Sequence, residues 1–473
     1  MSGELADLAL SELSPLLESR EVSPVEVTEA VLDNVERFDG TLKAYIDVYR
    51  EDALAAAAAA EAEIAGGGYR GTLHGVPVGV KDNLYVAGRV TTMGSKIHRD
   101  FVPTADATAV ERLAGAGAVL LGKLNMHEYA LGGTTDNPWH GTCRNPWDLD
   151  KSPGGSSGGS AAALASGMAT AALGSDTSGS IRIPAAFCGI VGLKPTYGRI
   201  SKFGCFPEAW TLDHVGPMGR SVADVAAVLD ALSGYDPRDP GSLDAGPTAT
   251  ARAMRTDCSG LTVGVVEDFY LADVDDEIAR SVRAAIDTLQ GLGARVESIA
   301  LPGLRDTEWA LTMIDTAETS TVHRRNLRDR PDDYGDDVRL LLECGELPSA
   351  VDYLEAQQLR RHLRAEVAAA FAGVDVLVGP TVPIRTPTIG EATATLNGRD
   401  VDALENLIRL VGPASLLGLP TLSLPCGLVD GLPVGLQVIG PAGGEQAVLD
   451  VGHAFEATAP LGDQRASAHL AGR

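Results

Sequence analysis

Residues 151–165 read Lys-Ser-Pro-Gly-Gly-Ser-Ser-Gly-Gly-Ser-Ala-Ala-Ala-Leu-Ala, and they are the starting point for interpreting the chain. The centre of this stretch, residues 154–160, is the densest motif in the sequence, with glycines on both sides of a serine pair. A loop of this composition can turn its backbone N–H groups toward a bound anion or oxyanion. The Lys-Ser-Pro before the loop and the apolar run after it indicate a strand-loop-helix order rather than a flexible linker. The loop is not a nucleotide-binding motif, because no G-K-[ST] closes it and no G-x-G-x-x-G follows a strand.

A second loop, Gly-Ser-Asp-Thr-Ser-Gly-Ser-Ile-Arg at residues 174–182, follows a short apolar segment. The residues just before Ser180 are small, so consecutive backbone amides could converge on one oxygen atom, as an oxyanion hole requires. Ser180 is therefore a candidate nucleophile, provided that a base can reach its hydroxyl.

A lysine is the candidate base. The nine histidines stand in unrelated contexts and no G-x-S-x-G nucleophile elbow is present. Lys81 directly follows the apolar segment at residues 76–80. Burial at the end of such a strand would lower the pKa of the lysine and make its neutral amine accessible.

The elements around these loops alternate between strands and helices, which predicts an α/β fold. We expect a large mixed, mostly parallel twisted sheet that helices cover on both faces. Strands are predicted at residues 76–80, 118–121, 168–174, 261–266, 296–301, 421–425 and 434–439, and helices after Ser23 and at 53–65, 108–116, 275–292 and 350–371.

The chain is expected to form one domain over residues 1–473. Within it we distinguish a helical N-terminal segment (1–70), a catalytic core (71–220), a surface excursion rich in Pro, Gly, Asp and Ser (236–260), and a C-terminal part of the same sheet (261–473).

The composition argues against several classes of function. A formal net charge of -26 argues against direct contact with a nucleic-acid backbone by this chain, although a partner could carry a basic surface. The six cysteines are widely spread without a C-x-x-C pair, and no His/Cys motif for a metal is present, so neither a metal nor a cofactor is expected. The sequence shows no secretory signal and no long apolar run, which predicts a cytoplasmic protein that does not enter a membrane.

The two glycine-rich loops, together with Gly-Val-Pro-Val-Gly-Val-Lys-Asp-Asn at residues 75–83, resemble the amidase signature family. Three further segments also resemble that family: residues 192–199, 212–217 and 435–440. The resemblance covers essentially the whole chain, and the ordered set of motifs is far more specific than any one glycine-rich loop.

The resemblance implies a catalytic triad. Lys81 would be the neutral base at the start of a proton relay, and Ser156 the bridging serine that follows a cis Gly155–Ser156 peptide bond. Ser180 would attack the carbonyl carbon and form an acyl-enzyme. Gly155 would also lie beside the substrate.

The resemblance assigns supporting roles to the neighbours of the triad. The oxyanion would be held by the backbone amides of Thr177, Ser178, Gly179 and Ser180. Ser157 would support the lysine, whereas Asp176 and Arg182 would brace the loop. The chain departs from the family pattern at Ser178, where the family usually has glycine, so this side chain must find room and could touch the substrate. Cys188 is interpreted as a buried packing residue and not as a thiol nucleophile.

Within the family, the sequence favours a free-standing amidase that hydrolyses a small amide, anilide or hydrazide. Trp210 stands where amidotransferase subunits usually carry small residues, and it predicts an aromatic wall for the substrate. Residues 352–360 also resemble free amidases. We therefore expect a small-molecule amide substrate, no direct nucleic-acid binding, no membrane contact and a possible homodimer. The alternative within the family is the glutaminase subunit of a tRNA-dependent amidotransferase, and the alternative of another class is a catalytically silent anion-binding subunit.

Overall fold

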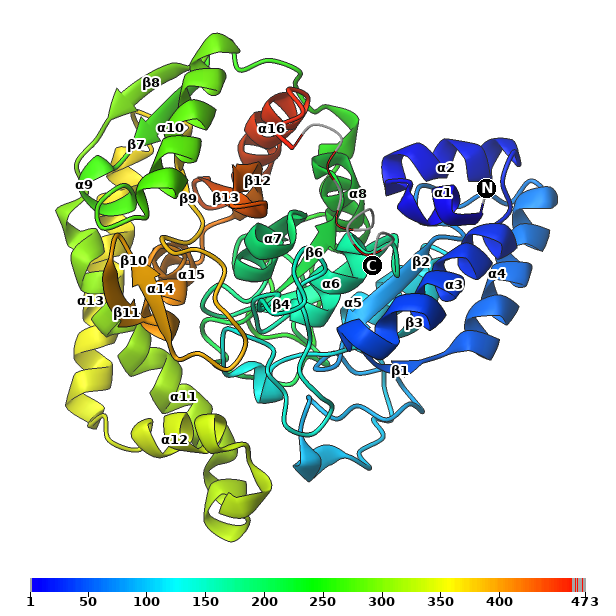
Figure 1. The fold of residues 1–473 in the computed structure, drawn as a ribbon, viewed down its shortest axis with the longest axis horizontal. Helices are drawn as coiled ribbons and strands as arrows, with labels where there is room; N and C mark the ends of the chain where they lie inside the picture. Colours follow the sequence, from blue (N-terminus) through cyan, green and yellow to red (C-terminus); the bar gives the residue numbers. More distant parts are fainter. Residues whose placement is uncertain (1, 462–463, 465, 467–469, 471–473) are drawn as a thin grey trace.

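An 11-stranded mixed sheet runs through the computed structural model, which describes residues 2–461, 464, 466 and 470 (Figure 1). The strand order in this sheet is β1-β3-β2-β4-β6-β5-β12-β13-β9-β7-β8, and β10 and β11 form a separate two-stranded sheet. The strands are β1 (Tyr45–Val48), β2 (Pro77–Lys81), β3 (Val119–Leu124), β4 (Ala171–Asp176), β5 (Val191–Lys194), β6 (His214–Gly219), β7 (Thr262–Val265), β8 (Arg295–Ser298), β9 (Val376–Pro380), β10 (Thr393–Leu396), β11 (Arg399–Asp402), β12 (Thr421–Val429) and β13 (Leu432–Ile439).

The α-helices fall into an N-terminal group, a group interleaved with the strands and a long insertion between β8 and β9. The first group is α1 (Ser2–Asp7), α2 (Leu10–Ser19), α3 (Pro24–Leu42) and α4 (Arg50–Ala65). The interleaved helices are α5 (Thr108–Gly115), α6 (Gly158–Ala165), α7 (Arg182–Cys188), α8 (Val222–Leu232), α9 (Glu267–Tyr270), α10 (Asp276–Gly291), α14 (Ala403–Arg409), α15 (Gly412–Leu417) and α16 (Glu445–Glu456). The insertion contains α11 (Thr307–Asp329), α12 (Asp336–Cys344) and α13 (Ala350–Ala370).

Helices cover both faces of the sheet, as expected for the predicted α/β class. Gly435 on β13 faces Ala186 of α7, because a Cβ at this glycine would lie 2.5 Å from the Ala186 Cβ. Leu422 on β12 instead contacts α16 and is paired with Val438 of β13. Because side chains alternate along a strand, positions 435 and 438 point to opposite faces, so α7 and α16 lie on opposite sides of the sheet.

The sheet is less parallel than the sequence predicts. Six neighbouring strand pairs are antiparallel, whereas four are parallel. The prediction of a mixed sheet is confirmed, but the expectation of mostly parallel strands is wrong. Residues 421–439 form a hairpin, and β5 and β6 pair antiparallel with their neighbours, so the middle of the sheet has no parallel pair.

The parallel pairing of β2 with β4 places Lys81 beside the serine-rich loop at residues 174–182. Val80 is paired with Leu173, so both strands end at the same edge of the sheet, β2 with Lys81 and β4 with Asp176. Strand β2 is buried at every position, and this includes the polar side chain of Lys81 at its end. Segments far apart in the chain thus deliver a lysine and a serine-rich loop to one place.

The remaining element predictions differ from the structure mainly at their boundaries. The predicted capping box at Ser23 is present at the start of α3, where Ser23 accepts a hydrogen bond from the Glu26 amide. The strand predicted at 168–174 begins only at Ala171, because the chain first turns at Gly167 (φ 68°) after α6. Residues 236–260 contain one short 3-10 turn, Thr250–Arg252, and otherwise neither helix nor strand.

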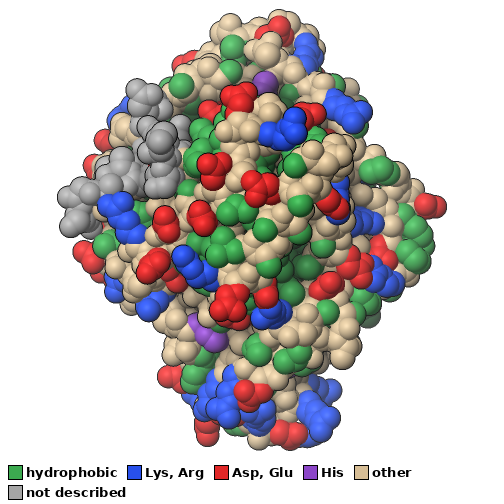
Figure 2. All heavy atoms as spheres, turned by 90° about the vertical axis from the view of Figure 1, so that its right-hand side faces the viewer, with side chains coloured by type: hydrophobic (Ala, Val, Ile, Leu, Met, Phe, Trp, Pro, Cys, Tyr) green, Lys and Arg blue, Asp and Glu red, His purple; other side chains and the backbone are tan. Residues whose placement is uncertain are grey.

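The surface of the molecule is mixed in charge despite the strongly negative total. Figure 2 shows acidic and basic side chains interspersed over one face, with basic side chains gathered at its lower end. In the described part of the chain, no helix combines the length and the apolar composition needed to cross a membrane.

Candidate active site

Lys81 lies at the end of β2 with its side chain fully buried. Its Nζ donates hydrogen bonds to Ser156 Oγ at 2.7 Å and to Ser175 Oγ at 2.8 Å. Burial lowers the pKa of Lys81 to about 8, against the opposing effect of nearby acidic groups, the largest of which comes from Glu208. An amine with this pKa is partly neutral near physiological pH and can accept a proton from the serine that it contacts.

Ser175 is a contact of Lys81 that the sequence analysis did not identify. Its hydroxyl meets both the Lys81 ammonium and Asn83 Nδ2, the latter at 2.9 Å. Ser157, which the family resemblance places against the lysine, instead donates its hydroxyl to the Ser175 carbonyl at 3.2 Å. Ser157 therefore supports the lysine through Ser175. No sequence signal pointed to Ser175, because its contact with Lys81 depends on the parallel pairing of β2 with β4.

Ser156 follows a cis peptide bond with Gly155, which is the backbone geometry that the resemblance implies. A side chain at Gly155 has no room, because its Cβ would lie 2.6 Å from the Thr134 backbone nitrogen. The loop also contacts the second motif directly, since the Ser157 amide donates to the Ser180 carbonyl at 3.1 Å. The two serine loops are thus held against each other next to Lys81.

Ser180 lies in a cavity that Gly155 and Ser178 also line. Its hydroxyl makes no hydrogen bond with any residue that the structure describes, whereas Lys81 and Ser156 are joined directly. The structure therefore brings Lys81 and Ser156 into contact and places Ser180 beside them, with its side chain free to reach a substrate.

The backbone amides around Ser180 differ from the expectation at one position. The Gly179 amide donates to Asp176 Oδ1 at 2.9 Å, so it is already engaged. The amides of Thr177, Ser178 and Ser180 have no acceptor among the described residues. Gly179 has a φ of +122°, and a Cβ there would lie 2.5 Å from Val411 Cγ2, so glycine is required for the shape of the loop.

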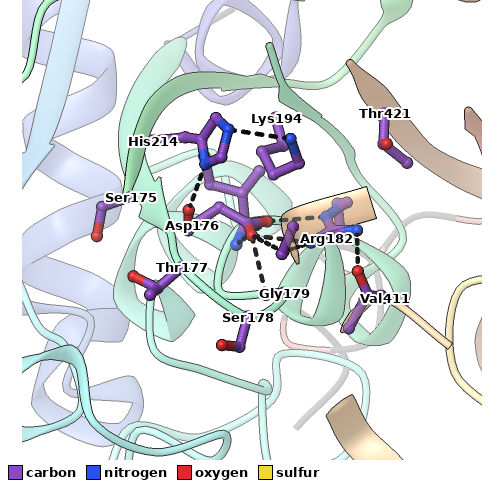
Figure 3. A network of polar contacts seen from close by, with 12 residues as sticks. Ser175, Asp176, Thr177, Ser178, Gly179, Arg182, Lys194, His214, Val411 and Thr421 are labelled. Atoms are coloured by element: carbon purple, nitrogen blue, oxygen red, sulfur yellow. Dashed lines mark hydrogen bonds and ion pairs between the residues drawn. The ribbon is translucent and has the colours of Figure 1, made fainter. Parts of the chain in front are cut away.

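A buried ion pair braces this loop (Figure 3). Arg182 donates from Nε and Nη2 to the two oxygens of Asp176, each at 2.9 Å, and both side chains are fully buried. Arg182 also donates to the Val411 carbonyl and to Ser415 Oγ, which anchors the loop to the α14–α15 segment. Burial alone would raise the pKa of Asp176, but the guanidinium outweighs that effect and holds the pKa below its ordinary value.

The histidine nearest to this loop is not placed as a base for Ser180. His214 lies on β6, with Nδ1 against the Asp176 carbonyl at 3.1 Å and Nε2 against Lys194 Nζ at 3.3 Å (Figure 3). Burial and the adjacent Lys194 keep its pKa well below the ordinary value. Both ring nitrogens are therefore occupied by structural contacts.

The lining of the cavity beside Ser180 bears on the predicted aromatic wall. Trp210 is 42% exposed and does not line the cavity that holds Ser180, so the expected aromatic wall stays a prediction without support from this cavity. Glu208, two positions earlier, lines the cavity instead, together with Asp315 of α11. Ser178 donates its hydroxyl to Asp315 Oδ2 at 2.6 Å. This hydrogen bond accommodates the serine side chain at a position where the family usually has glycine.

In the described part of the chain, neither a metal centre nor a reactive thiol accompanies this arrangement. Among residues 2–461, 464, 466 and 470, no group of three or more His, Cys, Asp or Glu side chains is placed to hold a metal ion. Cys188 is buried on α7, its thiol directed at the Pro153 carbonyl, and burial raises its pKa. A thiol of this kind stays protonated and unreactive.

Comparison with known proteins agrees with the geometry. Residues 26–449 match the protein-family model described as Amidase. A curated relative from Moorella thermoacetica, a subunit of glutamyl-tRNA(Gln) amidotransferase, is 41% identical over 96% of this chain and 97% of its own length. The fold is also similar to that of a protein from a vestigial complex, which is described as revealing the evolutionary origins of an s-triazine catabolic enzyme. That protein is 36% identical, with a TM-score of 0.92, and the match covers 95% of this chain and 98% of the other. A bacterial aryl acylamidase of the amidase signature enzymes is similar as well (30% identity, TM-score 0.89, 98% and 99% coverage).

These relatives correct one expectation from the sequence. The prediction of a small-molecule amide substrate without direct nucleic-acid binding is contradicted, because the Moorella relative is named as part of an amidotransferase of glutamyl-tRNA(Gln). Net charge was a poor guide to partners, since it describes one chain and not the assembly in which that chain works. Together, the family match, the 41% identity and the shared fold establish that this chain is an amidohydrolase that acts on carbon–nitrogen bonds. The chain belongs to the amidase signature family.

Proposed function

We propose that the chain hydrolyses a carboxamide through Ser180, Ser156 and Lys81 and serves as the ammonia-releasing subunit of a tRNA-dependent amidotransferase. The observation that carries the chemistry is the 2.7 Å hydrogen bond between the buried Lys81 amine and Ser156, beside the cavity that holds Ser180. The 41% identity to the Moorella amidotransferase component supports the assignment to that class of assembly.

The reaction follows from the arrangement. Ser180 Oγ attacks the carbonyl carbon while its proton passes through Ser156 to neutral Lys81. The oxyanion that forms is held by the free amides of Thr177, Ser178 and Ser180, which would contribute more in this buried site than in water. The proton returns through Ser156 to the leaving nitrogen, and ammonia departs from the acyl-enzyme. A water molecule then attacks the ester, which gives the carboxylic acid and restores Ser180.

The proposal is tested with the chain purified through an affinity tag from its own host, so that bound partners remain attached. We expect ammonia release from glutamine and, with glutamyl-tRNA(Gln) added, formation of glutaminyl-tRNA(Gln). A fluorophosphonate should label Ser180, and Ser180→Ala should abolish both labelling and ammonia release. Labelling on another serine would contradict the catalytic assignment.

A second candidate is an amidase that works without partner subunits. The observation that favours it is the acidic lining of the cavity, because no positively charged side chain among the described lining residues is available for the carboxylate of glutamine. This candidate predicts that the isolated chain hydrolyses other carboxamides faster than glutamine, and that the tag-purified material forms no glutaminyl-tRNA(Gln).

A further inference from the structure

The cavity next to Ser180 is small and has an acidic end. Its volume is about 80 Å³, and most of its lining is apolar or glycine. The charged side chains in the lining are two carboxylates, Glu208 from the loop before β6 and Asp315 from α11. No lysine, arginine or histidine of the described chain lines it. Two acids facing a common space without a cation are costly unless something with N–H donors or positive charge pairs with them.

The two carboxylates differ in how their oxygens are satisfied. Asp315 accepts the Ser178 hydroxyl on Oδ2, and the Thr319 hydroxyl lies 3.3 Å from Oδ1 but closer, at 2.8 Å, to the Asp315 backbone carbonyl. Glu208 is only 5% exposed and its carboxylate accepts one hydrogen bond, from the Thr177 hydroxyl to Oε2 at 2.8 Å. Its Oε1 has no hydrogen-bond partner within the described part of the chain, and the residue lines the cavity. Glu208 thus presents an unpartnered oxygen of a buried side chain to the place where a substrate's acyl group would lie.

Behind the cavity, the Thr177 hydroxyl lies between the carboxyl groups of Glu208 and Asp213 and cannot donate a hydrogen bond to both. Thr177 Oγ1 lies 2.8 Å from Glu208 Oε2 and 2.7 Å from Asp213 Oδ1, yet a hydroxyl has only one proton to donate. Both contacts are favourable only if one of the two carboxyl groups is itself protonated. Consistent with this, burial and the neighbouring acids Asp315 and Asp213 raise the pKa of Glu208 well above its ordinary value. Lys81 is near enough for its charge to interact with that of Glu208, but its Nζ donates to Ser156 and Ser175 and makes no hydrogen bond with either acid of the cavity.

We infer that Glu208 and Asp315 form a subsite for an ammonium group on the acyl part of the substrate. The inference rests on the proposed role of Ser180, because that residue defines where the acyl group lies. An ammonium group supplies three N–H donors and one positive charge. It would satisfy Glu208 Oε1, favour release of the extra proton to solvent and offset the carboxylates that then line the cavity. A substrate whose far end carries a carboxylate and no ammonium would meet like charges and be rejected.

The test uses amides of matched length whose far ends differ in charge. 4-Aminobutyramide carries an ammonium, pentanamide a methyl in its place, and succinamate a carboxylate. We expect kcat/KM to fall in that order, with the ammonium compound preferred over pentanamide about 10- to 100-fold, the range of a charge-assisted hydrogen bond. The same order is expected for protection of Ser180 against fluorophosphonate labelling, a measurement that needs no turnover.

Two isosteric variants tie the preference to the subsite. Glu208→Gln and Asp315→Asn each keep an oxygen that can accept from Thr177 or Ser178 but can no longer ionise. The ratio of kcat/KM for 4-aminobutyramide to kcat/KM for pentanamide should therefore fall toward one. Glu36→Gln, on the exposed face of α3, is the control and should leave the ratio unchanged. Thermal unfolding of each variant verifies that it is folded.

The outcomes separate the two proposals. Absence of labelling at Ser180 would overturn the proposed catalytic role. Labelling of Ser180 without preferential protection by 4-aminobutyramide, or a preference that survives Glu208→Gln and Asp315→Asn, would overturn the ammonium subsite alone.

Discussion

At the residue scale, the candidate site is centred on a lysine whose pKa is lowered by burial. Lys81 is fully buried, and the groups that accept its hydrogen bonds, Ser156 and Ser175, are neutral hydroxyls. Lys81 and Ser156 could be predicted from sequence because each sits in a distinctive motif. Ser175, Glu208 and Asp315 could not, since their importance arises from neighbours that only the folded chain brings together.

The first prediction concerns the protonation of Lys81. Because only the neutral amine can accept a proton, activity should rise with pH through the lysine pKa of about 8 and then level off. Lys81→Ala should lower kcat about 100- to 10,000-fold. Lys81→Arg should fail equally, because a guanidinium stays charged at any working pH. A pH–rate profile of the wild type with kcat values for both variants checks this, and near-wild-type turnover by Lys81→Arg would refute a lysine base.

The second prediction concerns Ser175 as a positioning residue. Ser175→Ala removes one of the two hydroxyls that orient the Lys81 amine, so kcat should fall about 10- to 100-fold with little change in KM. The pH–rate profile should also shift, which a purely structural defect would not produce. The matched control is Ser160→Ala, since Ser160 is equally buried but donates to the Leu173 carbonyl and does not touch Lys81. Equal losses in the two variants would argue against the positioning role.

At the element scale, the loop after β4 depends on a brace from two other segments. Asp176 ends the strand, Arg182 begins α7, and the arginine reaches on to Val411 and Ser415. The sequence motif predicts that these two charged residues brace the loop. The contacts of Arg182 with Val411 and Ser415 could not be predicted, because these residues lie far from Arg182 in the sequence. Strand boundaries were predicted less well than strand existence, because turns such as the one at Gly167 are set by local backbone geometry.

The third prediction tests this brace. Arg182→Met leaves the fully buried Asp176 carboxylate without its counter-ion, and removing one partner of a buried pair costs about 3–5 kcal/mol of unfolding free energy. Urea denaturation measures the loss. Arg325→Met is the control, because the ion pair of that arginine is surface-exposed and such pairs contribute about 0–1 kcal/mol. A loss no larger than the control's would show that the ion pair does not hold the loop.

At the scale of the whole molecule, the two halves of the chain meet in one sheet. Strand β5 from the first half pairs with β12 from the second, and one hydrophobic core extends from the N-terminal helices to α16. The α/β class was predictable from the alternation of elements. The strand order and the antiparallel centre were not, since local hydrophobic patterns carry no information about which strands become neighbours.

The fourth prediction follows from this continuity and tests the single-domain organisation, which remains a prediction. Because neither half has a complete sheet, we expect a single cooperative unfolding transition. Far-UV circular dichroism and tryptophan fluorescence should give coincident urea midpoints. Two separated midpoints, or a stable fragment of residues 261–473 after limited proteolysis, would indicate two independently folding units.

The insertion between β8 and β9 also bears on how such a molecule acquires new specificity. The hydrolytic groups come from β2 and the two serine loops, whereas much of the opposite cavity wall comes from α11, α12 and α14, through Asp315, Leu341 and Leu404. If the proposed roles hold, we expect mutations in these helices to change which substrates are accepted and to leave the contacts of Lys81 with Ser156 and Ser175 intact. A mutant library confined to those three helices is then a direct route to a new substrate.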